Sequence, residues 1–220
     1  MTYALRDGLS FCTIEGRHLF LDLTADRYFC LPAGIEESFE NLRRGGALSL
    51  GDLEDLGACG IVEANKSADI TACTPPPAPV ASLLHDRVPT PPVMDILAAA
   101  AQLVRSSAEL KFMGLARTIA RLRARKRRAG GSSAPPCGAS TIARAAAAFQ
   151  ATGRYASIQD KCLPRSLAVA HRLLALGIAP ELVLGVTLGP FTAHAWVQWG
   201  DVLVNERTEI TRQFTPILVV

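Results

Sequence analysis

Hydrophobic and polar residues alternate in three short segments near the start of the chain. The segments are LSFCTIE (9–15), HLFLDL (18–23) and RYFCLP (27–32). Alternation with a period of two is typical of strands that bury one face. The breaks between them, Gly16-Arg17 and Thr24-Ala25-Asp26, have the length of hairpin turns. The pattern therefore predicts a small antiparallel meander.

Two amphipathic helices and another strand are predicted next. In GIEESFENLRR (34–44), apolar residues recur at helical spacing, and acidic residues occupy the first turn, where the helix dipole favours them. SLGDLEDLG (49–57) is a second short helix with Ser49 as its candidate N-cap. GIVEAN (60–65) follows as a strand. Residues 1–70 are therefore predicted to form a winged-helix-like domain.

Two segments rich in proline and glycine interrupt the rest of the chain. Residues 73–93 hold seven of the fourteen prolines, and residues 129–138 read AGGSSAPPCG. Because proline fixes φ and lacks a backbone N–H, we expect an extended Pro-rich linker over 71–93. The second domain then spans 94–220.

The second domain is predicted to pack helices on an antiparallel sheet. Helical spacing of apolar residues predicts helices over 94–128, over 141–150 and over CLPRSLAVAHRLLALG (162–177). ELVLGVTLG (181–189) is predicted to be a buried strand, and PFTAHAWVQWGDVLVNE (190–206) a hairpin. The whole chain is therefore assigned to the α+β class.

The composition indicates a soluble protein. The 220 residues are 49% hydrophobic, enough for one large domain or two small ones. The most apolar window, 94–104, contains Asp95 and Gln102 and is far shorter than the ~20 residues that span a bilayer. The N-terminus has no apolar run of signal-peptide length. We expect a cytoplasmic protein with no membrane partner.

The charge gives little indication of nucleic-acid binding. The formal net charge is only +3. One basic run ends the long helical segment, with cations at Arg117, Arg121, Arg123, Arg125, Lys126, Arg127 and Arg128. Cations suit a helix C-terminus, and no aromatic residues are interleaved for base stacking. The run is interpreted as a solvated helix end, and no nucleic-acid partner is expected.

The cysteines do not form a metal-binding pattern. No two lie in a CxxC pair, and no histidine stands at zinc-finger spacing. We therefore expect reduced thiols, no metal and no cofactor. The six are Cys12, Cys30, Cys59, Cys73, Cys137 and Cys162.

One of these cysteines, Cys162, lies at the predicted start of a helix. Pro164 fits only the first helical turn, so Cys162 is placed where free N–H groups and the dipole favour a thiolate. His194, on the first strand of the hairpin, is the candidate base. His171 is a poorer base because it lies nine residues along the same helix, about 180° around the axis. The other histidines, His18 and His85, lie in other segments and are interpreted as structural.

The residue that orients His194 depends on the hairpin register. A two-residue turn at Gly200-Asp201 places Arg207 opposite His194 and makes Asn205 the diagonal neighbour. A three-residue loop or a bulge makes Glu206 the diagonal neighbour instead. Turn chemistry favours the first alternative.

A cysteine at a helix start, packed on a sheet that presents a histidine, is the arrangement of papain-like and transglutaminase-like enzymes. CLPRSLAVAHRLLALGI (162–178), PFTAHAWVQWGDVLVNE (190–206) and FTPILVV (214–220) resemble the B proteins of lasso-peptide biosynthesis. These are transglutaminase-like cysteine peptidases that cut the leader from a ribosomally made precursor. The resemblance implies that Cys162 is the nucleophile and His194 the base. Glu206 stands where the family usually has an aspartate, and for this reason we favour Glu206 over Asn205.

The resemblance also implies a reaction and its partners. The Cys162 thiolate attacks a precursor peptide bond, and water releases the acyl group. The backbone N–H of Cys162 and the side chain of Gln159 are the candidate oxyanion donors. A separate ATP-using, asparagine-synthetase-like partner then forms the macrolactam from the freed core N-terminus.

Residues 1–65 resemble the leader-recognition module of the same pathway, although GGALSL (45–50) leaves little room for its middle helix. In that family the leader adds as a strand to the sheet edge. By this resemblance, the candidate leader-binding residues are Tyr28, Phe29, Cys30, Leu53 and Leu56.

Two alternatives of other classes stay open. One is a non-catalytic adaptor that binds the precursor, and the other is a winged-helix nucleic-acid binder that uses the basic run. Cleavage that disappears in Cys162→Ala excludes both.

Overall fold

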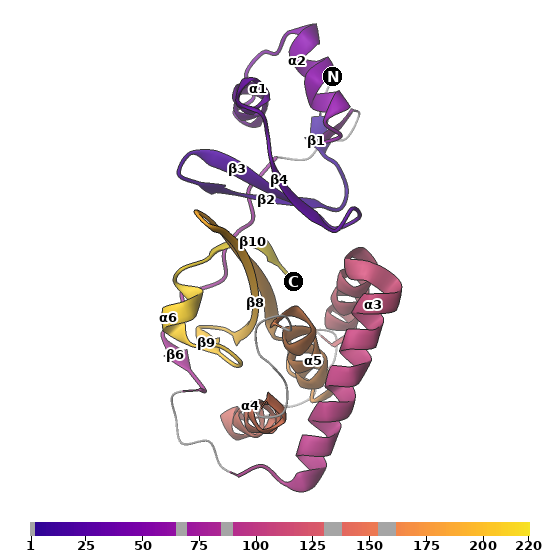
Figure 1. The fold of residues 1–220 in the computed structure, drawn as a ribbon, viewed down its shortest axis with the longest axis vertical. Coiled ribbons are helices and arrows are strands. Elements are labelled where there is room, and N and C mark those ends of the chain that lie inside the picture. Colours follow the sequence, from indigo (N-terminus) through magenta and orange to yellow (C-terminus); the bar gives the residue numbers. More distant parts are fainter. Residues whose placement is uncertain (1–2, 65–69, 85–89, 130–137, 154–161) are drawn as a thin grey trace. The chain divides into compact units, whose positions relative to one another are not determined.

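The computed structural model describes residues 3–64, 70–84, 90–129, 138–153 and 162–220. The chain forms two compact units, Met1–Thr74 and Pro75–Val220. Both units combine helices with strands (Figure 1). The mixed helix-and-sheet class predicted from the sequence is therefore confirmed.

The first unit contains the predicted meander. Strands β2 (Leu9–Ile14), β3 (Arg17–Asp22) and β4 (Arg27–Cys30) form an antiparallel sheet in the order β2-β3-β4. The turn between β2 and β3 is Glu15-Gly16, one residue earlier than predicted, and both residues have positive φ, 51° and 80°. Two-residue hairpins favour this backbone because its twist matches that of the strands.

Two helices, α1 (Ala33–Arg43) and α2 (Leu50–Ala58), follow the meander. The predicted N-cap of α2 is confirmed, because Ser49 and Asp52 each accept a hydrogen bond from the other's backbone N–H. The residues between the helices form no third helix. The winged-helix likeness of this unit stays a prediction.

A second ladder and an aromatic core complete the first unit. β1 (Tyr3–Leu5) pairs antiparallel with β5 (Val62–Ala64), and β1 was not predicted because three residues are too few to show alternation. The core side chains come from both sheets and both helices. They include Phe11, Phe20, Leu31, Phe39, Leu56 and Ile61.

The second unit begins with a helix that is broken in the middle. The sequence predicts that residues 94–128 are helical, and α3 (Val93–Ala129) is helical but interrupted at Gly114, where φ is 75° and ψ is 171°. Arg121 pairs with Glu109, although twelve residues of straight helix would place them about 18 Å apart. The chain therefore folds back at Gly114 into two helical halves (Figure 1).

A five-stranded sheet lies beside the helices of the second unit, in the order β10-β7-β8-β9-β6. α4 (Ala139–Gly153) and α5 (Cys162–Ala175) come between β6 and β7 in the chain, and α5 packs on β7 and β8 and against α3 (Figure 1). The predicted helix on an antiparallel sheet is thus present. The remaining bounds are β6 (Ala81–Ser82), β7 (Glu181–Leu188), β8 (Phe191–Trp199), β9 (Val202–Leu203), α6 (Thr208–Thr211) and β10 (Thr215–Val219).

Part of the Pro-rich segment belongs to the sheet of the second unit. β6 pairs in parallel with β9, and the Val80 N–H donates to the Asp201 carbonyl at 2.9 Å. Gln198 Nε2 donates to the Pro77 carbonyl at 2.8 Å. An edge strand tolerates proline because only one side of it needs backbone donors. Residues 77–83 therefore border the second unit instead of forming a free linker.

Candidate active site

The candidate nucleophile, Cys162, is the first residue of α5. Burial raises the pKa of its thiol. The hydrogen bond and charge of His194, together with the backbone N–H groups of Ala195 and Leu163, more than offset this effect and leave the pKa below its usual value. A lowered pKa enriches the thiolate, which is the nucleophilic form of cysteine.

His194 lies on β8 between Cys162 and Glu206. Its Nε2 is 2.6 Å from Oε2 of Glu206, and each of these two side chains is 20% exposed. Burial lowers the pKa of His194, but the hydrogen bonds and negative charges of Cys162 and Glu206 raise it to about 9. Because Nε2 faces Glu206, Nδ1 is the nitrogen left to face the thiol. These shifts favour a thiolate–imidazolium pair.

Glu206 is held in the loop after β9. Its Oε1 accepts from the Arg207 N–H at 2.9 Å, and its carbonyl accepts from Ser82 Oγ at 2.6 Å. Burial raises the pKa of the Glu206 carboxyl, but hydrogen bonds from His194 and Arg207, and the charges of His194 and Arg165, lower it overall. The acid is therefore kept ionised beside the imidazole.

The hairpin register is the one that turn chemistry favours, although Glu206 is the residue whose side chain contacts His194. Trp199 pairs with Val202 across the two-residue turn, which confirms the first register. However, β9 ends at Leu203, so the expectation that Arg207 lies opposite His194 is wrong. The chain leaves the sheet, and the loop carries Glu206 to the imidazole.

Asn205 has other partners. Its Oδ1 accepts from the Val197 N–H at 2.7 Å, and its Nδ2 donates to Ser166 Oγ at 2.9 Å. Neither of these hydrogen bonds reaches His194. Asn205 joins the loop to β8 and α5.

Side chains take the place of a neighbouring strand along one edge of β8, because β9 is only two residues long. Val197 N–H donates to Asn205, and the Ala195 carbonyl accepts from Ser166 Oγ at 2.9 Å. The Ala195 N–H points to the Cys162 thiol. The start of α5 is therefore docked on an edge of β8 that β9 does not cover.

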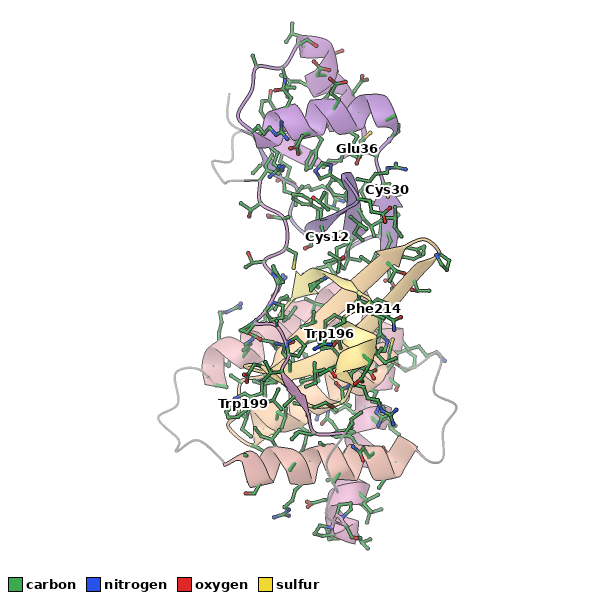
Figure 2. All side chains as sticks on the ribbon, turned by 90° about the vertical axis from the view of Figure 1, so that its left-hand side faces the viewer. Cys12, Cys30, Glu36, Trp196, Trp199 and Phe214 are labelled. Carbon is green, nitrogen blue, oxygen red and sulfur yellow. The ribbon has the colours of Figure 1, made fainter. Side chains whose placement is uncertain are left out.

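Two aromatic rings lie beside His194, one on β8 and the other directly before β10. Trp196 stacks near its ring at 6.3 Å between centroids, and Phe214 lies at 5.3 Å. Figure 2 shows Trp196 and Phe214 close together on the second unit, where both pack over Gly185. A Cβ at Gly185 would be 2.6 Å from Trp196 and 2.9 Å from Phe214. This group was not predicted from the sequence, although a glycine within an apolar strand is a signal of close packing.

His171 lies in a separate buried cluster between α5 and α3. Its Nδ1 is 3.1 Å from the Arg125 guanidinium, and its Nε2 is 3.5 Å from Glu109. Burial and the charge of Arg125 lower the pKa of His171 to about 4, with Glu109 opposing them. The structure therefore does not bring His171 to Cys162.

The candidate leader-binding residues lie in the first unit, and their exposure differs. Tyr28, Cys30 and Leu53 are half-buried. Phe29 stacks on Phe20 at 5.2 Å. Leu56 is fully buried in the core, so its side chain offers no exposed surface to a peptide.

Other residues singled out from the sequence have different positions. Gln159, Cys137 and His85 lie outside the described residues. In the first unit, His18 lies between Glu36 and Glu40, at 3.3 and 3.2 Å. Among the described residues, no three His, Cys, Asp or Glu side chains are grouped so that they could hold a metal ion. In the same part of the chain, no helix is long and apolar enough to cross a bilayer.

The comparison with protein families agrees with this geometry. Residues 102–219 match the model of the transglutaminase-like superfamily, a group that includes cysteine peptidases. The match covers more than half of the chain and contains Cys162, His194 and Glu206. The chain therefore belongs to the transglutaminase-like superfamily. No curated protein and no solved structure matches it.

Proposed function

We propose that this protein is a cysteine peptidase that removes the leader from a ribosomally made lasso-peptide precursor. The observation that carries the proposal is the Cys162–His194–Glu206 arrangement. A thiol at a helix start faces an imidazole whose other nitrogen is 2.6 Å from a carboxylate. This is the set of groups that covalent acyl transfer by cysteine requires.

Each group has a step in the proposed reaction. The Cys162 thiolate attacks the scissile carbonyl carbon, and His194 protonates the leaving amine as the C–N bond breaks. Water, deprotonated by His194, then attacks the thioester and releases the leader as a carboxylate. Glu206 holds the imidazole and stabilises its positive charge throughout. The N–H of Cys162 at the helix start is the proposed oxyanion donor.

The edge of β8 next to His194 supports the proposal that the substrate is a peptide. Backbone groups of alternate residues point to the same side of a strand, so the N–H and carbonyl of Ala193 point to the same edge as those of Ala195. Within the described part of the chain, no group pairs with Ala193 on that edge, and its side chain is exposed. An extended peptide can therefore hydrogen-bond there, directly beside His194.

The lasso-peptide assignment is supported by the sequence. The motifs at 162–178, 190–206 and 214–220 resemble the B proteins, and the first of these carries Cys162. Under this proposal, the first unit binds the leader, and an asparagine-synthetase-like partner uses the freed core N-terminus.

The test is mass spectrometry of a candidate lasso precursor incubated with the full chain, with and without the partner synthetase and ATP. We expect two new masses, leader and core, whose sum is the precursor plus one water. Cys162→Ala should retain precursor binding and lose cleavage. Continued cleavage by Cys162→Ala, or binding without cleavage by the wild type in the complete mixture, contradicts the proposal; the second outcome favours the adaptor alternative.

A further inference from the structure

A hydrogen-bond relay joins the three segments that carry the candidate catalytic residues. Asn205 Nδ2 donates to Ser166 Oγ at 2.9 Å, and the Ser166 hydroxyl donates to the Ala195 carbonyl at 2.9 Å. On its other side, Asn205 Oδ1 accepts from the Val197 N–H at 2.7 Å. The relay therefore connects the loop after β9, the first turns of α5 and the centre of β8.

Each member of the relay is close in the chain to a residue of the candidate active site. Ser166 is one helical turn after the nucleophile, and the other two members are adjacent to the base and the acid. The pairs are Ser166 with Cys162, Ala195 with His194, and Asn205 with Glu206.

The donors and acceptors of the relay fit in one direction only. A backbone N–H can only donate, so the Val197 N–H requires the amide oxygen of Asn205. This leaves the amide nitrogen to donate to Ser166, and the hydroxyl proton goes to the Ala195 carbonyl. Ser166 is 0% exposed, so loss of its hydroxyl leaves buried polar groups without a partner.

We propose that Ser166 and Asn205 are positioning residues that fix the separation between the Cys162 thiol and the His194 imidazole. Neither side chain touches the reacting atoms. The relay instead fastens α5 to β8 at the end of the helix where the thiol lies. A slip of the helix along the strand would lengthen the thiol–imidazole contact and weaken the ion pair. The inference rests on the proposed function only in taking Cys162 as the nucleophile.

The experiment measures the alkylation rate of Cys162 by iodoacetamide against pH in the full chain, resolved by peptide mass spectrometry. Ser166→Ala and Asn205→Ala should each lower the rate at pH ~6.5 by about tenfold, which corresponds to a rise of one unit in the thiol pKa. Because both residues belong to one relay, the double variant should lose little more than either single variant. Ser166→Thr, which keeps the hydroxyl, should restore most of the rate.

Ser106→Ala is the matched control. It removes an equally buried serine hydroxyl, 0% exposed, from α3, where Gln102 Nε2 is its hydrogen-bond partner at 3.2 Å. This variant should keep the wild-type pH profile. If Ser166→Ala does not fold, Asn205→Ala carries the test alone, because Asn205 is only half-buried.

A pH profile that is unchanged in folded Asn205→Ala and Ser166→Ala overturns the proposal. A profile that shifts equally in Ser106→Ala also overturns it, since the effect would then be general destabilisation. Alkylation needs no peptide substrate. An absence of precursor cleavage therefore contradicts the proposed function but does not affect the interpretation of the alkylation rates.

Discussion

In the described part of the second unit, His194 and His171 have surroundings that shift the pKa in opposite directions. Burial disfavours the imidazolium at both sites. At His194, the thiol and Glu206 overcome this effect and raise the pKa to about 9. At His171, burial and the charge of Arg125 lower the pKa to about 4. The sign is therefore set by the charge of the neighbours.

The same difference separates the roles of the two sites. Each ring nitrogen of His194 has an anionic partner, the Cys162 thiolate or the Glu206 carboxylate, and the thiolate is a nucleophile. The side chain of His194 remains 20% exposed. The side chain of His171 is 0% exposed and faces a guanidinium from α3. The first arrangement can exchange protons with a substrate, whereas the second keeps a neutral ring inside the fold.

The largest expected difference between the two sites is in turnover. His194→Ala should reduce precursor cleavage by about 10³-fold, because general acid–base catalysis contributes about 10²–10⁴-fold. His171→Gln should leave turnover of the folded protein within about threefold, since the ring has no part in the reaction. Initial cleavage rates followed by mass spectrometry measure both. Equal losses of cleavage rate in the two variants would contradict a catalytic role that belongs to His194 and not to His171.

A smaller loss of turnover is expected when the carboxylate beside His194 is neutralised. Glu206→Gln should lower kcat by about 10²-fold, because the neutral amide no longer stabilises the imidazolium. Glu109→Gln, the equivalent change beside His171, should leave kcat of the folded protein unchanged. Asn205→Ala should cost less than Glu206→Gln. The reverse order for Asn205 and Glu206 would overturn the assignment of the acid.

The two histidines should also give stability opposite dependences on pH. The pKa of His171 falls from 6.5 to about 4 on folding, so only the unfolded chain binds this proton between those values. Stability from His171 is thus complete above pH 6.5 and falls as pH drops towards 4, by about 3 kcal/mol in total. For His194, with a pKa raised to about 9, stability is complete below pH 6.5 and is lost as pH rises through 9.

Urea unfolding at a series of pH values measures how the free energy of unfolding depends on pH. His171→Gln should flatten the acid side of the stability profile, and His194→Gln should flatten the alkaline side. An acid slope that survives in His171→Gln would show that other groups produce it.

The smallest effect concerns the packing that supports His194. Gly185→Ala places a methyl group 2.6 Å from the Trp196 ring, and overpacking of this kind costs about 1–3 kcal/mol. We expect a lower unfolding midpoint and a modest loss of turnover. Gly189→Ala, in the turn between β7 and β8, is the control, because nothing lies within 4 Å of its added Cβ. Equal midpoints for the two variants would contradict the role given to Gly185.

Local patterns predicted the parts of the fold that depend on local sequence. The meander, the two-residue turn at Gly200-Asp201 and the start of a helix at Cys162 follow from alternation, turn chemistry and Pro164. The break at Gly114 was missed because one glycine in a helical pattern costs only about 1 kcal/mol, and does not show whether the helix continues. What decides the break is the packing of the two halves, including the Arg121–Glu109 pair.

The parts that were not predicted depend on contacts distant in sequence. The pairing of the Pro-rich segment with β9 joins Ser82 to Leu203, and the relay joins Ser166 to Asn205. Alternation alone predicts that the second strand of the hairpin continues through Asn205. In the structure, the side chain of Asn205 accepts a hydrogen bond from the edge of β8, and the chain then leaves the sheet. Glu206 was therefore obtained from the family resemblance and not from the register.

The most direct test of the Cys162–His194 pair is competition among the cysteines for iodoacetamide at pH ~6.5, read by peptide mass spectrometry. An unperturbed thiol titrates near ~8.5, so Cys162 should be labelled ahead of all other cysteines. Cys12, whose pKa is raised to about 12 by burial and by Cys73 and Cys30, should be labelled last. The preference for Cys162 should disappear in His194→Ala. Uniform labelling of the wild type, or an undiminished preference in His194→Ala, would contradict an activated nucleophile at Cys162.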